Sequence, residues 1–178
     1  MKINKIAKLG LLAAISIILV QFIHFPIIPG ASYLEYDVAD IPILIGAFLY
    51  GPVAGILLTL IVSVIQGMTV SAGSGWVGIV MHFFATSTLV LIASILYKYK
   101  HNLKWGIIGL ILGSIGMILI MIPLNLIFTV HFFGYPQKIV EASIVPVIIP
   151  FNAFKAVVNS LLTIILYKRI GKLLKVNS

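Results

Sequence analysis

The sequence contains no cysteine and only four acidic residues among its 178 positions. Without cysteine the chain can form neither disulfides nor thiolate metal sites, and it has no cysteine nucleophile. Charged residues make up 9% of the chain and its mean hydropathy is +1.21, whereas soluble domains carry about 25% charged residues. Since so few charges cannot cover the surface of a soluble fold, the composition predicts an integral membrane protein.

Motifs that supply energy are also missing. No stretch reads G-x-x-x-x-G-K-[ST], so the chain has no recognisable means of hydrolysing ATP. No apolar segment carries a pair of acids that could relay protons. The net charge of +8 would suit nucleic acid, but every Lys and Arg except Lys138 and Lys155 lies in three short clusters. That pattern is typical of membrane topology signals, and we expect no nucleic-acid partner.

Apolar runs divide the whole chain, residues 1–178, into a single domain of six membrane segments. The expected segments are 6–25, 41–50, 53–70, 76–97, 105–128 and 150–170. A spanning helix needs about 20 residues, so the second segment is too short to cross comfortably by itself. The N-terminus lacks a convincing cleavage site and is read as a retained first helix. The expected fold is an all-α bundle of six transmembrane helices.

The basic clusters predict the orientation. They fall at the N-terminus, in the 98–104 loop and at the C-terminus, which lie on one side of a six-segment chain. The positive-inside rule makes that side cytoplasmic. The 24–40, 71–75 and 131–149 connections then face outward.

The stretch from Tyr33 to Pro52, YLEYDVADIPILIGAFLYGP, holds three of the four acids. A charged, aromatic loop that enters a membrane segment usually lines a site. We expect Glu35 and Asp37 mainly to solvate and anchor a lid over that site. Asp40 is the acid that we expect to touch a ligand.

Lys155 is the basic residue that most needs an explanation, because apolar residues flank it in the last segment. A lysine at the bilayer centre costs about 2.5–3.5 kcal/mol on insertion scales. The lysine either extends to the outer interface or contacts a ligand inside the bundle. Asn152 and Asn159 share its helix face, and either asparagine could instead bond to a neighbouring helix.

Other polar or small residues allow two readings each. Asn125 could satisfy carbonyls freed by Pro123, or it could bind a ligand. His82, next to Met81, is expected to be a packing residue and not a metal ligand, and we expect no metal site. Gly10 and Ala14 lie one turn apart on the first segment, where small residues let another helix approach closely. They serve either a partner subunit or packing inside the bundle.

Two stretches resemble a known family. YLEYDVADIPILIGAFLYGPVAGI, with an aromatic-rich fourth segment and PFNAFKAVVNSLL near the end, looks like the substrate-binding S component of energy-coupling factor (ECF) vitamin transporters, most of all the riboflavin-specific type. The resemblance implies six helices in a prokaryotic plasma membrane and a ligand held near the outer face. It implies ligand contacts by the region of Leu34 and by Asn125, Asn152 and Lys155.

The chemistry of the flavin ring is compatible with these residues. Its donor–acceptor edge suits asparagine amides, and its apolar faces suit Leu34, Tyr36 and Met81. The family also docks a transmembrane coupling subunit, driven by two ATPase subunits, against small residues of the first helix. In this chain those residues would be Gly10 and Ala14. Riboflavin is then the transported substrate, and no resident cofactor is expected.

Three other interpretations stay open at this point. The chain could be an S component for another vitamin or for FMN. It could be a small intramembrane enzyme that uses His82, Asp40 or Lys155, although no two of these have a spacing that sets up a base and a nucleophile. It could also be a structural membrane subunit, which would have no reason to bury Lys155 beside Asn152.

Overall fold

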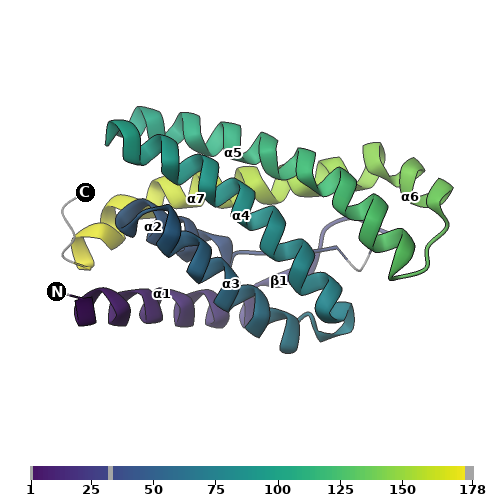
Figure 1. Cartoon of the computed structure of the whole chain (residues 1–178), viewed down its shortest axis with the longest axis horizontal. Coiled ribbons are helices and arrows are strands. Elements are labelled where there is room, and N and C mark those ends of the chain that lie inside the picture. The colour runs from purple at the N-terminus through teal and green to yellow at the C-terminus, as the bar shows by residue number, and fades with distance from the viewer. Residues whose placement is uncertain (1, 32–33, 175–178) are drawn as a thin grey trace.

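The computed structural model describes residues 2–31 and 34–174, and it is almost entirely helical (Figure 1). Tyr33, the first residue of the acidic stretch, lies outside the described residues. The helices run in chain order as α1 (Lys2–Phe22), α2 (Asp40–Tyr50), α3 (Pro52–Met68), α4 (Gly75–Lys100), α5 (Leu103–Leu124), α6 (Gln137–Ser143) and α7 (Ile149–Leu173). Three short turns of other helical type are η1 (Ala72–Ser74), η2 (Asn125–Thr129) and η3 (Ile144–Ile148).

Four helical stretches are long and apolar enough to cross a membrane within the described part of the chain. They are 3–22, 72–100, 103–129 and 137–173. α2 and α3 are apolar but shorter. At 1.5 Å per residue, the 11 residues of α2 span about 16 Å, roughly half of a hydrocarbon core. The fold is therefore that of a helical membrane protein, with α2 as the short segment that the sequence predicts.

α2 lies at the centre of the bundle. Nine of its eleven residues, Asp40 through Phe48, are buried, and it packs against α1, α3, α4 and α7. Its all-round apolar character explains this position, because a helix that is hydrophobic on every side is stable only inside a core or a membrane. Gly51, at φ +92°, makes the turn into α3, whose first residue is Pro52.

The connection between α1 and α2 contains a two-stranded antiparallel sheet, which the sequence analysis had treated as loop. β1 (His24–Pro26) pairs with β2 (Glu35–Asp37), with Phe25 opposite Tyr36. The first helix consequently ends at Phe22, earlier than expected. Strands of three residues leave too short an alternation to be recognised from sequence.

The last segment begins earlier than expected. Residues 137–173 form one continuous helical stretch through α6, η3 and α7, although the sequence analysis placed 131–149 in a connection. Proline cannot donate a backbone hydrogen bond within a helix, so Pro146 and Pro150 would ordinarily favour a break here. The structure instead contains a π-helical turn, η3, around Pro146, and the chain continues without leaving the helical path.

α4 and α5 pack closely through glycines. A Cβ built on Gly109 would lie 2.8 Å from the carbonyl oxygen of Ala93, and one on Gly113 would lie 2.7 Å from that of Leu89. Only hydrogen fits at those distances, so the two helices approach backbone to backbone. This contact fixes α4 relative to α5.

The first turn of α1, the α4–α5 turn and the last turn of α7 lie at one end of the molecule (Figure 1). These three places carry the basic clusters of the described residues. The α3–α4 connection and the approach to α6 lie at the other end. The three clusters are therefore on one side, as the sequence predicts.

Candidate functional site: a cavity with one charged and one amide wall

A cavity of about 490 Å³ lies at the end of the bundle opposite the basic clusters. This volume is within the range of small-molecule sites. Ser71, Gly73 and Ser74 from the α3–α4 connection line it, as do Phe133 and Tyr135 from the approach to α6. Residues from β2, α3, α4, α5 and α7 form the rest of the wall. The cavity thus gathers residues from Leu34 to Lys155 that are far apart in the sequence.

Lys155 and Asp37 form the centre of the charged wall. Lys155 Nζ lies 2.7 Å from Asp37 Oδ2 and 3.9 Å from Asp40 Oδ2. All three side chains are almost fully buried, with Lys155 5% exposed, Asp37 2% and Asp40 0%. Lysine is almost never buried unless it is paired. The choice between an interfacial lysine and one inside the bundle is therefore resolved in favour of the bundle.

The expectation that Asp37 mainly solvates a lid is wrong. Asp37 Oδ1 accepts a hydrogen bond from the backbone N–H of Ala39 at 3.0 Å, and its Oδ2 accepts one from Gln66 Nε2 at 3.2 Å. With Lys155, these bonds hold β2 against α3 and α7. The sequence contained a usable signal, because a buried lysine needs a counter-charge and the chain offers only four acids.

Asp40 lies behind the cavity wall and not in it. Its carboxylate accepts hydrogen bonds from Thr86 Oγ1 at 3.0 Å and Asn159 Nδ2 at 3.3 Å. His82 Nε2 lies 3.3 Å from Asp40 Oδ1. Asp40 is the first residue of α2, where a negative charge is favourable. These contacts give it a structural environment, and the cavity lining does not include it.

Tyr36 points away from the cavity, as β2 alternates its side chains between two faces. Its hydroxyl donates to Asn159 Oδ1 at 3.0 Å, and its ring packs between Phe25 and Phe154. Burial, together with the neighbouring Asp37 charge, raises the pKa of the Tyr36 phenol, so the hydroxyl remains a donor. Its expected position against a ligand is not what the structure shows.

Asn159 is consequently a connecting residue. Besides its bonds to Tyr36 and Asp40, its Nδ2 donates to the backbone oxygen of Asp37 at 3.1 Å. One asparagine thus joins α7 to both the strand and the start of α2. The sequence analysis had allowed for such a bonding role.

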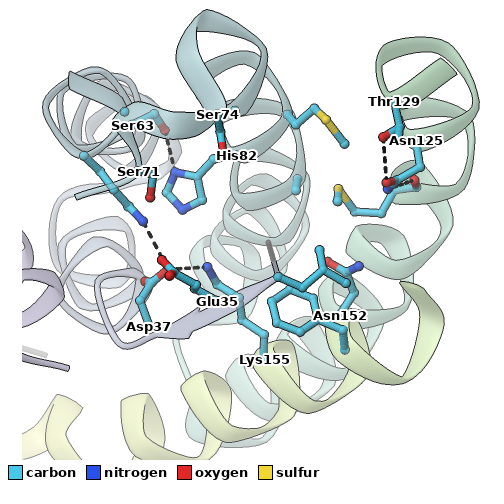
Figure 2. Close-up of a pocket in the computed structure, with 18 of the residues that line it drawn as sticks. Glu35, Asp37, Ser63, Ser71, Ser74, His82, Asn125, Thr129, Asn152 and Lys155 are labelled. Atoms are coloured by element: carbon cyan, nitrogen blue, oxygen red, sulfur yellow. Dashed lines mark hydrogen bonds and ion pairs between the residues drawn. The ribbon is translucent and has the colours of Figure 1, made fainter. Parts of the chain in front are cut away.

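His82 and Gln66 extend the charged wall. His82 Nδ1 lies 2.9 Å from Ser63 Oγ, which joins α4 to α3. Gln66 Oε1 is buried and has no hydrogen-bond partner among the described residues. Both side chains line the cavity with Lys155 and Asp37, and Figure 2 shows His82, Ser63, Asp37 and Lys155 grouped on one side.

The opposite wall carries amides. Asn125 Nδ2 donates to the carbonyl of Met121 at 2.8 Å, and Thr129 Oγ1 donates to Asn125 Oδ1 at 3.1 Å. Asn152 Nδ2 donates to the carbonyl of Ile148 at 2.8 Å. Asn125 is the first residue of the π-helical turn η2, and the partner of Asn152, Ile148, is the last residue of η3. Such turns are frequent at functional sites. Figure 2 shows Asn125 and Thr129 across the cavity from His82.

Apolar side chains complete the lining between these walls. They are Leu34, Val70, Met81, Ala85, Met117, Met121 and Phe151. Thioethers adapt their shape and interact favourably with aromatic rings. The cavity therefore combines a polar edge on two sides with surfaces suited to a flat ring. Of the residues expected at a substrate, it brings together Leu34, Met81, Asn125, Asn152 and Lys155.

Gly10 and Ala14 lie far from this chemistry, on α1. Both are exposed, and no atom lies within 4 Å of the position that a Cβ on Gly10 would occupy. The face that they share is therefore open for contact with lipid or with another helix. Packing inside the bundle, the other reading of these residues, does not occur at this face.

Comparisons with known proteins agree with this architecture. The family described as "ECF transporter, substrate-specific component" matches residues 4–167. "Riboflavin transporter RibU" of Staphylococcus aureus (strain TCH60) is 35% identical over 178 residues, covering 97% of this chain and 93% of the relative. "Riboflavin transporter FmnP" of Bacillus subtilis (strain 168) is 29% identical over 166 residues, covering 89% of this chain and 87% of the relative.

A solved structure is also similar. It is described as "Structure and mechanism of the S component of a bacterial ECF transporter". Its TM-score is 0.84 at 34% sequence identity, and the match covers 98% of this chain and 99% of that one. The similarity therefore extends over the full bundle and is not limited to one helix pair.

Proposed function

This chain belongs to the family of ECF transporter substrate-specific components, and we propose that it captures riboflavin in the cavity described above. Members of this family are transporter components, so the interpretation as an intramembrane enzyme is dropped. Relatives named as riboflavin transporters cover nearly the full chain. They favour riboflavin over an unrelated vitamin.

The observation that carries the proposal is the placement of Asn125, Asn152 and Lys155 around one apolar cavity. The pyrimidine edge of isoalloxazine alternates acceptors and a donor, which amide groups and an ammonium can match. Its ring faces are apolar and suit Leu34, Met81 and the neighbouring methionines. The ribityl hydroxyls can both donate and accept, and Gln66 Oε1 is a buried acceptor available to them.

The orientation follows from the charges. With the basic clusters at one end and the cavity at the other, the positive-inside rule puts the cavity on the outer face of the cell membrane. Both chain termini are then cytoplasmic. In this arrangement all six helical segments cross or enter the bilayer, and α2 is shielded from lipid by its neighbours.

The remaining part of the proposal concerns partners. The chain has no motif for ATP hydrolysis, so uptake requires energy from elsewhere. A transmembrane coupling subunit with two ATPase subunits would supply it, docking on the open face of α1 at Gly10 and Ala14. Small residues there allow the close helix approach that such docking needs.

The test is the visible absorption spectrum of the chain purified from a flavin-containing host. A riboflavin binder is yellow, and denaturation releases a flavin that chromatography identifies as riboflavin. A colourless preparation that also fails to quench the fluorescence of added riboflavin would contradict the proposal. If a different vitamin is released, that vitamin is the bound substrate and riboflavin is not.

A further inference from the structure

The charges that line the cavity do not favour an anionic ligand. Among the described lining residues, three carry a formal charge at neutral pH: Glu35, Asp37 and Lys155. A fourth charge, Asp40, lies directly behind Lys155. The wall therefore holds three carboxylates against one ammonium, even though the whole chain has a net charge of +8.

Lys155 is already neutralised. Its ammonium contacts Asp37 at 2.7 Å and has Asp40 at 3.9 Å, so two carboxylates surround one cation. A phosphate that approached Lys155 would have to displace Asp37, which Gln66 and the backbone of Ala39 also hold. Lys155 is thus a poor phosphate ligand.

Glu35 adds a second negative charge at a different point of the wall. It is half-buried, lines the cavity, and forms no ion pair in the described part of the chain. Since Glu35 and Asp37 are both on β2, one strand presents a carboxylate at two points of the same cavity (Figure 2).

We propose that Glu35 and Asp37 are specificity residues that make the cavity select an uncharged flavin over a phosphorylated one. A phosphomonoester carries a charge of about −1.5 to −2 near neutral pH, whereas the ribityl chain of riboflavin is neutral. Repulsion between charges at a partly buried site is stronger than in bulk water. This inference rests on the proposed riboflavin function and goes further by naming the form of flavin.

The opposing charge at the cavity mouth is smaller. α4 begins there at Gly75, and a helix N-terminus is equivalent to about half a positive charge. The full negative charge of Glu35 alone exceeds that half positive charge, and the wall also has more carboxylates than ammonium groups. The net electrostatic effect of the cavity therefore still disfavours a phosphate.

The experiment compares the dissociation constants of riboflavin and FMN for the purified full chain in detergent, measured by quenching of flavin fluorescence. The variants are Glu35→Gln and Asp37→Asn. The control is Glu141→Gln, which removes the same charge from an exposed site on α6, paired only with Gln137. Wild-type protein should bind riboflavin about tenfold or more tightly than FMN.

Glu35→Gln should narrow the FMN-to-riboflavin ratio of dissociation constants about three- to tenfold, and Glu141→Gln should leave it unchanged. Asp37→Asn should also narrow this ratio, because it removes a second carboxylate charge from the cavity wall. Equal wild-type affinities, or an unaltered ratio in Glu35→Gln, would overturn the inference while riboflavin binding itself stands. If neither flavin binds the wild type, the proposed function fails and the inference with it.

Discussion

At the residue scale, the proposed function gives the Lys155–Asp37 pair two roles, one in stability and one in recognition of the ligand. Removing one partner of a buried ion pair leaves an uncompensated charge, which is far more costly than removing both. The same ammonium lies at the cavity surface, where it can meet a ligand edge. The two roles can be tested separately, since stability depends on pairing the charges of Lys155 and Asp37, whereas binding depends on the Lys155 ammonium as a hydrogen-bond donor.

Asp37→Asn should lower the free energy of unfolding by about 3 kcal/mol, because Lys155 retains only the more distant Asp40. The double variant Asp37→Asn with Lys155→Met should recover part of that loss, because the buried ammonium is removed with its main partner and Asp40 keeps its hydrogen bonds from Thr86 and Asn159. Thermal melting of the purified proteins measures both changes. If the single variant melts at the wild-type temperature, the pair has no structural role.

The double variant should still bind riboflavin poorly. A hydrogen bond from a charged donor contributes about 1.5–3 kcal/mol, so we expect about a 10- to 150-fold weaker affinity. Fluorescence titration measures it, with the lipid-facing Leu161→Ala on the same helix as the control; Leu161 is 56% exposed. A double variant that binds as wild type would remove Lys155 from the site.

Asn152→Ala gives an independent check on the amide wall. Its side chain is 1% exposed and, among the described residues, bonds only to the carbonyl of Ile148, one turn earlier, so its loss should affect the fold little. We expect riboflavin affinity to fall about tenfold. Unchanged titration curves would show that the amide wall does not contact the ring.

The residue scale also shows what sequence reasoning can and cannot supply. Lys155, Asn152 and Asn125 were recognisable from the sequence, because a polar group is costly in an apolar membrane segment and usually has a function there. Asp37 was misjudged, because its burial depends on β2 folding back over α7, and a three-residue strand leaves no pattern. Tyr36 was misplaced for the same reason, since the strand register decides which side chains face the cavity.

At the element scale, the sequence predicts most of the helices from the length of their apolar runs, but it does not predict where they end. Pro146 and Pro150 suggested a connection, yet π-helical geometry at η3 carries the helix through. That turn places Ile148 where its carbonyl accepts from Asn152. The sequence contains the prolines, but not the tertiary packing that keeps this segment helical.

The α4–α5 contact gives a prediction for an element. Gly113→Leu would force a side chain against the backbone of Leu89, and such overpacking costs about 1–3 kcal/mol or more. We expect a lower melting temperature and weaker riboflavin binding, since Met81 and Met117 lie on these helices. Gly10→Leu is the matched control, because its Cβ would meet open space. Equal melting temperatures would contradict the close approach.

At the scale of the whole molecule, polarity runs along the long axis, with basic clusters at one end and the cavity at the other (Figure 1). This asymmetry was predictable, because it depends only on segment count and on where lysines fall. The depth and lining of the cavity were not, because they depend on how α2 and β2 pack inside the bundle.

The absence of native cysteine allows a direct test of orientation. In intact cells, a membrane-impermeant maleimide should label Lys138→Cys, which is exposed near the cavity end. Lys104→Cys, in the basic α4–α5 region, should react only after permeabilisation. Labelling in the opposite order would reverse the proposed topology.

Riboflavin, on this proposal, is held in the cavity between the amide wall and the charged wall. The most direct measurement is an experimental structure of the riboflavin-loaded chain. We expect the isoalloxazine ring inside the cavity, with its polar edge at hydrogen-bond distance from Asn152 and Lys155 and its faces against Leu34 and Met81. Riboflavin bound elsewhere, with this cavity empty, would contradict it.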